Sequence, residues 1–521
     1  EIAQCLVGSE MCIRDRYSRV NDFGSDTVYY RPSAETGPIS ITVEENAAIK
    51  AGYVIFGRYS QYNSETHATD YIDLTSVEFK SGSSVSATND ITFQNGIGPV
   101  TSTGATYEAS NVYFKSPLVS SNDVINAGGL YYQNGGNLSV QNLTLTQSSS
   151  AGLYFDSNAT GSISDSSLGV SGRLYVQGGS NINIVNSTTT LVSSSMSQVV
   201  GGSSLVVDGG KFSVSQAGEE IQGFSVKQGS TLEFKNADVD MSGVRLQTGT
   251  DSSFKDKSAA ITIDNSTFKT GFIDLYGYTS GGAMSVINII NGSNFTGSFF
   301  KSQEEPDVIF DPETGDYEVI YKTVNYYARG GTINVSGANT VFNVSEGFIQ
   351  AENSADQVYI TVLNISDGGK ANINGALDVS SVAIDNGSVS ADSIVVSSGR
   401  NMSVTGASAV ETNMLSVHEG STVSVDEAAT LDIAKLEVIL SSDIAEGTEF
   451  NLNDIFGDAT SVVLSAVENN VIMGDSGGNL FEAIVSEGGV ITAGAAIPEP
   501  AAYAAIFGAL AFAFSAWRKR K

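Results

Sequence analysis

Residues 205–214 read Leu205-Val-Val207-Asp-Gly209-Gly-Lys-Phe212-Ser-Val214. Apolar side chains alternate with polar ones on both sides of an Asp-Gly-Gly turn. A period of two directs one row of side chains inward and the other outward, as a half-buried β-strand requires. The glycines supply the positive φ of a tight corner. The stretch therefore predicts two short strands joined by a corner.

The same pattern of alternating apolar residues and a polar turn recurs along the chain, in residues 174–178, 224–234, 363–368, 382–389, 402–406 and 415–423. Several copies start 19 or 20 residues apart, as from Leu205 to Phe224, from Leu363 to Val382 and from Val382 to Met402. A repeat this short cannot bury its own apolar row, so it must stack on its neighbours. We expect an all-β chain folded as a right-handed parallel β-helix, a β-solenoid, with ladders of Asn, Ser and Thr at its corners. A string of antiparallel sandwiches is the alternative, because the same alternation suits both.

Segments of the chain differ in how regularly they repeat. Residues 17–120 are richer in Tyr and charge and predict an N-terminal cap or irregular first coils, since the end of a stack must be shielded. The solenoid is expected over residues 121–490, with a hairpin insertion near 304–328 whose turn is Asp311–Asp316. Residues 436–490 would form the closing coils and 491–497 a short linker. The repetitive body resembles the passengers of autotransporter-type adhesins.

Composition and charge exclude several classes of protein. The chain has 521 residues, with 26 Lys and Arg against 57 Asp and Glu, giving a net charge of −31. So acidic a chain has few basic side chains to neutralise the phosphates of DNA or RNA. We therefore expect that it does not bind nucleic acid. Hydrophobic residues make up 41% of the chain, too many for a disordered protein.

The last residues of the sequence combine three unlike elements. Pro498-Glu499-Pro500 is a rigid breaker, an uncharged apolar run covers 501–517, and four basic residues follow. As a helix the run would rise about 26 Å, enough to cross a thin bilayer, so we expect a single C-terminal transmembrane helix. The positive-inside rule keeps the basic residues cytoplasmic and places the body outside. The expected membrane residues are Ala501, Tyr503, Ile506, Phe507, Leu510, Phe512, Phe514 and Trp517, and the basic stop is Arg518, Lys519, Arg520 and Lys521.

These three adjacent elements, residues 498–521, resemble the PEP-CTERM sorting signal of Gram-negative bacteria. The resemblance implies export, anchoring in the inner membrane by the C-terminal helix, and processing near Pro498–Pro500 by an exosortase-type membrane protease. The protein would then reach the cell surface or the extracellular matrix. A permanent tail anchor and a hydrophobic core helix are the alternatives.

The other end of the sequence carries a different resemblance. Residues 5–16, Cys5-LVGSEMCIRD-Arg16, resemble a translated sequencing-adapter read-through. We therefore expect residues 1–16 to be non-biological and the true start, signal peptide included, to be missing, because export requires a signal that is not visible here. Cys5 and Cys12 both lie in this stretch, so we expect neither a disulfide nor a metal pair.

Few residues point to chemistry, and we predict no catalytic residue and no metal site. Single acids stand at corners, at Asp208, Asp264, Asp367 and Asp385, where a turn residue is the commoner role. His67 and His418 are far apart and are expected to be exposed loop histidines. Weak Ca²⁺ binding is conceivable at Asp311–Asp316, although a full oxygen ladder is lacking there, and Asp475-Ser-Gly-Gly478 is a fragment of a calcium-binding β-roll repeat.

Two classes of function remain at this point. The first is a non-enzymatic surface or matrix protein, adhesin-like or structural, whose partners are the exosortase-type protease, the membrane and exopolysaccharide or surface glycans. The alternative is a carbohydrate-active enzyme, a polysaccharide lyase or hydrolase, or a glycan-binding protein on the same scaffold. Tyr326 and Tyr327 are candidates for an aromatic platform under a sugar. Three or more charged residues converging in a groove would favour the enzyme.

Overall fold

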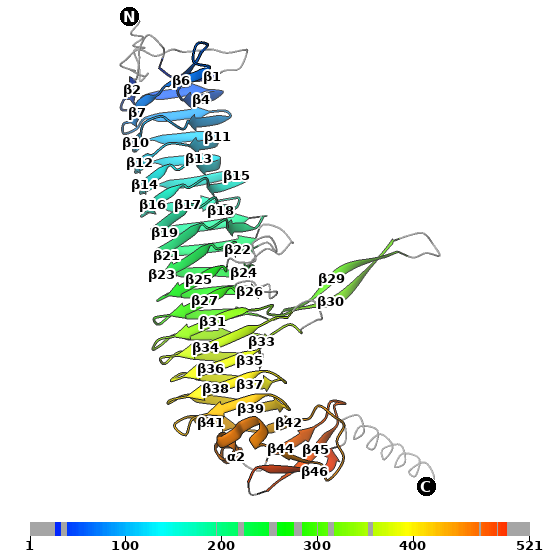
Figure 1. The fold of residues 1–521 in the computed structure, drawn as a ribbon. Helices are drawn as coiled ribbons and strands as arrows, with labels where there is room; N and C mark the ends of the chain where they lie inside the picture. The colour runs from blue at the N-terminus through cyan, green and yellow to red at the C-terminus, as the bar shows by residue number, and fades with distance from the viewer. Residues whose placement is uncertain are drawn as a thin grey trace, which may run out of the picture.

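The computed structural model describes residues 27–32, 39–193, 195–216, 223–249, 258–275, 284–299, 301–310, 317–352, 358–467, 470–486 and 488–497. The protein is nearly all β, with 65% strand and 3% helix. The described strands join into a 42-stranded sheet and two separate two-stranded hairpins. Figure 1 shows the large sheet wound into a long rod, with β1 (residues 27–30) near one end and β44–β46 (between residues 471 and 497) at the other. The fold is thus a parallel β-solenoid, and the antiparallel sandwiches are excluded for the body.

Each coil contributes to three parallel sheets, each running along the rod. The first sheet contains β2 (Ile39–Val43), β7 (Leu74–Phe79), β10 (Val100–Thr103), β12 (Leu118–Ser121), β14 (Asn137–Gln141), β16 (Thr160–Ser164), β23 (Thr231–Lys235), β25 (Ala260–Asp264), β27 (Val286–Ile290), β31 (Gly331–Ser336), β34 (Thr361–Ser366), β36 (Ser381–Asp385), β38 (Asn401–Thr405), β40 (Thr422–Val425) and the first parts of β19 (Asn181–Ser193) and β21 (Ser204–Gln216). The later parts of β19 and β21 bend into the second sheet.

The second sheet also holds β3 (Ala48–Ala51), β8 (Ser84–Ala87), β17 (Ser167–Val170), β28 (Asn294–Ser298), β32 (Val341–Val344) and β41 (Thr430–Ile433). Eight long strands begin in the second sheet and end in the third: β11 (Thr106–Phe114), β13 (Val124–Tyr132), β15 (Thr144–Phe155), β24 (Asp238–Gly249), β26 (Thr267–Leu275), β35 (Lys370–Asp378), β37 (Ser388–Val396) and β39 (Ala409–His418). The third sheet is completed by β1 (Thr27–Tyr30), β4 (Tyr53–Phe56), β9 (Asp90–Phe93), β18 (Leu174–Val176), β20 (Ser197–Val199), β22 (Gly223–Lys227), β33 (Phe348–Ile349), β42 (Leu436–Ile439) and β44 (Val471–Gly474).

The inward side chains of successive coils stack in register. One buried column of the first sheet runs through Ile182, Leu205, Leu232, Ile261, Ile287, Ile333, Leu363, Val382, Met402 and Val423. The intervals from Leu363 to Val382 and from Val382 to Met402 are therefore true coil repeats. The interval from Leu205 to Phe224 is not, because Phe224 belongs to the third sheet. Alternation alone cannot tell which of three sheets a strand joins.

Aromatic rings fill the N-terminal part of the core, on the inner side of the third sheet. Tyr30, Phe56, Phe93, Phe114, Tyr132 and Phe155 occupy one inward column, with ring centroids 4.8–5.5 Å apart and nearly parallel planes. The spacing matches the distance between neighbouring strands, so each ring covers the next. The core is a continuous stack along the rod, as a chain of short repeats requires.

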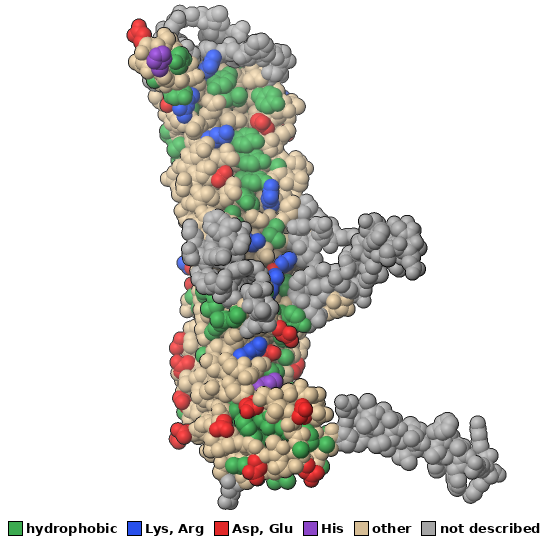
Figure 2. Space-filling view, turned by 45° about the vertical axis from the view of Figure 1, so that its right-hand side comes forward, with side chains coloured by type: hydrophobic (Ala, Val, Ile, Leu, Met, Phe, Trp, Pro, Cys, Tyr) green, Lys and Arg blue, Asp and Glu red, His purple; other side chains and the backbone are tan. Residues whose placement is uncertain are grey.

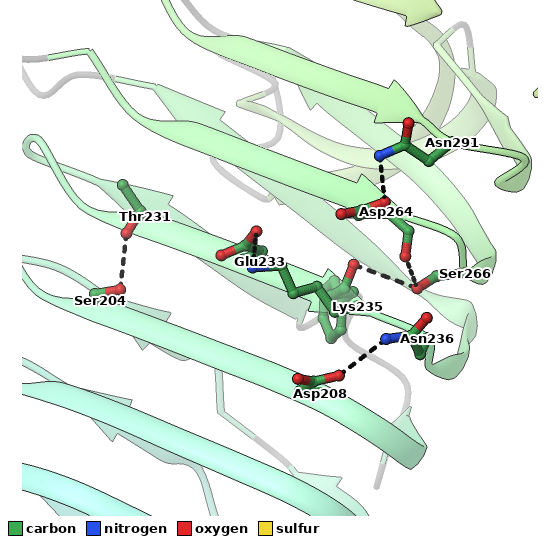
Figure 3. Close-up of polar contacts among 10 residues, drawn as sticks. Ser204, Asp208, Thr231, Glu233, Lys235, Asn236, Asp264, Ser266 and Asn291 are labelled. Carbon is green, nitrogen blue, oxygen red and sulfur yellow. Dashed lines mark hydrogen bonds and ion pairs between the residues drawn. The ribbon is translucent and has the colours of Figure 1, made fainter. Parts of the chain in front are cut away.

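The corners after the first sheet carry the ladders of polar side chains that the sequence predicts. Non-glycine residues with positive φ occupy many of them, among them Asn142, Asp165, Asn186, Asn236 and Asn265. In Figure 3 the Asn236 amide donates to Asp208 at 3.1 Å and the Asn291 amide donates to Asp264 at 2.7 Å, each across coils. Behind these corners lie buried serines. Ser187 Oγ, for example, accepts from the Ser166 amide at 3.0 Å. These bonds satisfy corner groups that the β-ladders leave unpaired.

The N-terminal part is more regular than expected. Parallel pairing reaches back to β1, and β12, at the predicted boundary near residue 120, pairs in register with β10 and β14 on its two sides. The described residues before 120 thus belong to the same three sheets as the rest, because the same inward alternation continues through their strands. One addition is the exposed antiparallel hairpin β5 (Tyr59–Asn63) and β6 (Ala68–Ile72).

A long hairpin interrupts the rod in the region predicted for it. Strands β29 (Lys301–Phe310) and β30 (Tyr317–Tyr326) pair antiparallel and project sideways from the solenoid (Figure 1). Their turn, Asp311–Asp316, lies outside the described residues. The prediction of weak Ca²⁺ binding at this turn therefore stays a prediction.

The C-terminal end closes differently from the closing coils that we predict. At this end the pairing becomes antiparallel: β44 pairs with β45 (Leu480–Val485), β45 with β46 (Val490–Ile497), and β46 with β43 (Glu449–Asn451). Between β43 and β44 the chain forms the short helices α1 (Asn453–Phe456), η2 (Gly457–Ala459) and α2 (Thr460–Ala466), which contact β40 and β41. The predicted linker 491–497 is wrong, since these residues form most of β46. Ile491 and Ala493 point into the core, and this alternation makes the segment a strand.

Candidate functional site

The outward side of the third sheet carries a row of tyrosines, and we call this side the tyrosine face. Tyr113, Tyr131, Tyr154 and Tyr175 are Cα partners on β11, β13, β15 and β18. Each is half-buried between two inward hydrophobic neighbours. Figure 2 turns the right-hand side of Figure 1 forward and shows hydrophobic and basic side chains interleaved down the rod, with acidic ones gathered toward its lower part.

The tyrosine rings stack on one another along the rod. The Tyr113 and Tyr131 centroids are 4.5 Å apart and those of Tyr131 and Tyr154 are 4.7 Å apart, with interplanar angles of 16° and 14°. Tyr175 is tilted by 48° at 5.8 Å from Tyr154. A Cβ at Gly129 would lie 2.6 Å from the Tyr131 ring, so glycine leaves the space into which that ring leans. The faces of the inner rings are covered by their neighbours, which leaves edges toward solvent.

Basic side chains accompany the row. Lys115 Nζ lies 5.4 Å from the centroid of the Tyr113 ring. The exposed Arg173 guanidinium lies 5.7 Å from the Tyr154 centroid and 5.4 Å from that of Tyr175, and its Nε donates to the Tyr154 hydroxyl at 2.8 Å. These distances are typical of cation–π contacts, which fix the direction in which each cation points.

Farther along the same face lies a buried carboxylate held by two arginines. Asp274 occupies the outward row, in register with Gln247, and its side chain is only 1% exposed. Arg245 Nη2 contacts Asp274 Oδ2, and Arg329 Nη2 donates to Oδ1 at 2.7 Å. Gln247 Nε2 donates to Oδ2 at 3.3 Å. Two cations on one carboxylate leave a net positive charge at this point of the face.

A second charged group lies toward the C-terminal end of the face. Asp378 contacts Arg400, and burial raises the pKa of the Asp378 carboxyl although Arg400 opposes this effect. His418, at the end of β39, is half-buried, and burial lowers its pKa because the imidazolium is poorly solvated there. The prediction of an exposed loop histidine is thus wrong for His418. It is right for His67, which lies exposed in the β5–β6 turn with Nδ1 3.1 Å from the Tyr62 hydroxyl.

A hollow of about 440 Å³ adjoins this second group and is lined by His418, Glu419, Glu437 and Asp475 among others. Two of its carboxylates already accept hydrogen bonds from backbone amides. Glu419 accepts from the Ser441 amide at 3.0 Å, and Asp475 Oδ1 accepts from the amides of Gly477 and Asn479 at 2.9 Å. Side-chain hydrogen bonds from Ser441 and Asn479 are the main cause that lowers the pKa of these two carboxyls, and the backbone bonds add to it. Charged residues do converge here, and Glu437 and His418 are the members that could act on a ligand.

The other residues singled out in the sequence have mostly structural surroundings. Asp208 and Asp264 accept the corner bonds of Figure 3; Asp367 accepts from Ser336 at 3.2 Å, and Asp385 from Thr405 at 3.2 Å. Tyr327 lies half-buried on the tyrosine face. Within the described part of the chain, no group of three or more His, Cys, Asp and Glu side chains is placed to hold a metal ion.

The sorting motif Pro498–Pro500, the apolar run 501–517, the basic stop 518–521 and both cysteines lie outside the described residues. Among the residues that are described, no helix is long and apolar enough to cross a membrane.

The sequence contains a signal for the tyrosine row that our reading of the repeats missed. Each tyrosine is the middle of a hydrophobic-Tyr-hydrophobic triplet: Val112-Tyr113-Phe114, Leu130-Tyr131-Tyr132, Leu153-Tyr154-Phe155 and Leu174-Tyr175-Val176. In a strand the flanking residues point inward and the tyrosine outward. The triplet alone does not show that the four strands are neighbours, which depends on the coil lengths.

Tyrosine ionisation should destabilise the rod at high pH. Burial raises the pKa of Tyr131 to about 12, and burial also raises the pKa values of Tyr113, Tyr107 and Tyr132. In each case the native state keeps a proton that the unfolded chain has lost above pH 10, so stability present below that pH falls as pH rises toward the native pKa. We expect a lower urea midpoint at about pH 11 than at about pH 9, and a smaller difference in Tyr131→Phe. Equal midpoints at both values would contradict this.

Asp274→Asn should leave two guanidiniums facing each other without their shared carboxylate. Removing one member of a buried ion pair costs 3–5 kcal/mol, and because Arg245 and Arg329 are 26% and 33% exposed we expect about 2–3 kcal/mol here. The measurement is the free energy of unfolding from urea denaturation. Asp238→Asn, at an exposed position of β24, is the control and should change it by less than about 0.5 kcal/mol. Equal effects of the two changes would show that the Asp274 group contributes nothing.

No known protein-family model matches this chain, and no curated protein matches it either.

Proposed function

We propose that the protein is a non-enzymatic, exported surface or extracellular-matrix component, adhesin-like or structural. The observation that supports this most is the parallel stacking of successive coils between β1 and β44, which continues on both sides of the two antiparallel hairpins. The corner acids of these coils bond to neighbouring coils. Such a rod presents similar outward side chains on every coil along its length. Its corner acids form hydrogen bonds between coils, which is a structural role and not a catalytic one. We further infer a right-handed coil, because parallel β crossovers are right-handed in nearly all known cases.

The delivery route belongs to the same proposal. Residues 501–517 would anchor the exported chain in the inner membrane, with residues 518–521 cytoplasmic. An exosortase-type protease would then cut near Pro498–Pro500 and release the rod to the cell surface or matrix. The resemblance of residues 498–521 to a PEP-CTERM signal supports this step.

Intact-mass analysis of the exported protein tests the route. The full chain, preceded by an export signal, would be produced in Gram-negative cells with and without an exosortase-type protease. We expect a C-terminus near Pro500 only when the protease is present, and the uncut chain when Glu499 is changed to alanine. A chain that ends at Lys521 in both strains would refute processing.

A carbohydrate-active enzyme is the second candidate, favoured by one observation. His418 and Glu437 line the hollow beside Asp378, and burial shifts the pKa values of His418 and Asp378 toward their neutral forms, as in many acid–base sites. Incubating the protein with acidic and neutral polysaccharides and measuring new reducing ends distinguishes the two. Product formation that Glu437→Gln abolishes would replace the first proposal with this one.

A further inference from the structure

Arginine is distributed unevenly over the rod. The part of the chain that the structure describes contains six arginines, and every one lies on the tyrosine face or just beyond the ends of its strands: Arg31, Arg58, Arg173, Arg245, Arg329 and Arg400. The chain as a whole carries a net charge of −31. Because the rest of the surface is acidic, the tyrosine face is the part of the described surface that can attract an anionic ligand.

Two basic side chains lie over the rings of the tyrosine row, Lys115 and one of these arginines, Arg173. Lys115 is placed over the first ring and Arg173 over the last two, on either side of Tyr131. Asp90 adds one carboxylate near the Tyr113 end of the row, and its Oδ1 accepts from the Asn111 side-chain amide at 2.9 Å. The row therefore offers exposed positive charge, phenolic hydroxyls and ring edges along successive coils.

These groups match the chemistry of an acidic sugar polymer. Guanidinium forms paired hydrogen bonds with carboxylate or sulfate, and lysine adds a point charge. A tyrosine side chain has an apolar ring and a polar hydroxyl, so it can contact both the C–H groups and the hydroxyls of a sugar. The strands repeat about every 4.8 Å along the rod, so a linear polymer lying along the row would meet similar groups at each coil. Elsewhere the acidic surface would repel a polyanion.

We propose that the tyrosine face, between Lys115 and Arg173, binds an acidic polysaccharide lying along the rod. This inference deepens the proposed function by naming the matrix partner, and rests on it in that the rod must be exported to meet such a polymer. The binding needs no bond to be made or broken.

The test is titration calorimetry of the full chain, kept in mild detergent, with polygalacturonate as the acidic probe and dextran as the neutral one. We expect binding to polygalacturonate that weakens as salt is raised, and none to dextran. Lys115→Gln with Arg173→Gln should weaken it about a hundredfold or more, since the loss of each charged hydrogen bond lowers the affinity about tenfold or more. Arg173→Lys should retain more affinity than Arg173→Gln.

The matched control removes two positive charges from the second sheet, Lys50→Gln with Lys211→Gln, at exposed positions of β3 and β21. It should leave the affinity within about twofold of the original, since neither residue adjoins the row. Thermal unfolding of each variant establishes that it is folded. Equal losses in the two double variants, equal binding of dextran, or no binding of polygalacturonate would each overturn the inference. None of these results bears on tail processing, which the mass analysis decides separately.

Discussion

Phe93→Ala is expected to lower the free energy of unfolding by about 3–5 kcal/mol. The Phe93 ring is fully buried and stacks on Phe56 at 4.9 Å and on Phe114 at 4.8 Å, with interplanar angles of 4° and 2°. Truncation removes both stacked contacts and leaves a cavity between coils that the β-ladders hold at a fixed spacing. Because the backbone on both sides is paired, the site cannot collapse to fill the space. Urea denaturation monitored by far-UV circular dichroism measures the loss.

The place of the damage is as informative as its size. In a solenoid each coil contacts only its neighbours, so destabilisation should concentrate near the substitution. We expect hydrogen exchange to accelerate in β4, β9 and β11 and to stay unchanged in β36–β39. Phe93→Leu keeps most of the volume and should cost less than about 1.5 kcal/mol. Uniform acceleration along the whole rod would show that the rod unfolds as one unit.

Gly210→Ala should be strongly destabilising, whereas Gly202→Ala should be only mildly so. The two glycines have almost the same backbone conformation, with φ of +76° and +73°. A Cβ at Gly210 would lie 2.1 Å from the Ser187 carbonyl oxygen, while a Cβ at Gly202 would meet nothing within 4 Å. The positive φ costs each variant about 1–2 kcal/mol, and overpacking adds about 1–3 kcal/mol for Gly210→Ala alone.

Urea denaturation of the two variants separates the two causes. The difference between them measures the collision with the adjacent coil, and the loss in Gly202→Ala measures the backbone term. If both variants lost the same stability, the contact with Ser187 would be irrelevant and the corner would relax freely. Gly135→Ala, with φ of +71° and open space around its Cβ, should repeat the result for Gly202→Ala.

Much of the fold follows from local pattern. Alternation in Leu205–Val214 is confirmed as strand, and the corners with positive φ lie at the Asn, Asp and Gly positions that the sequence indicates. Leu363, Val382 and Met402 form one column, and the sequence shows it because no insertion separates their coils. Phe224 shows the limit, since its strand has the same pattern as that of Leu205 but belongs to another sheet. The segment 491–497 shows it again, because short runs of small apolar residues fit a linker or an edge strand equally well.

The candidate site depended far more on the tertiary structure. Tyr113 and Tyr175 are separated by two intervening coils, and only the parallel register places them in one row with Tyr131 and Tyr154. In the Asp274 group, Asp274 bonds to Arg245, 29 positions before it, and to Arg329, 55 positions after it and beyond the hairpin β29–β30. Insertions of unequal length make such distances unpredictable from spacing.

The sequence by itself determined that the chain is an acidic stack of β-strands with polar corners, because strand direction and corner conformation are properties of a few neighbouring residues. The tertiary structure alone decided which outward side chains share a face, that an added Cβ at Gly210 but not at Gly202 would collide with the adjacent coil, and that the arginines gather beside the tyrosines. The physical reason is that coils of different lengths stack through backbone hydrogen bonds, so the register between coils, and not the count of residues, sets which side chains meet.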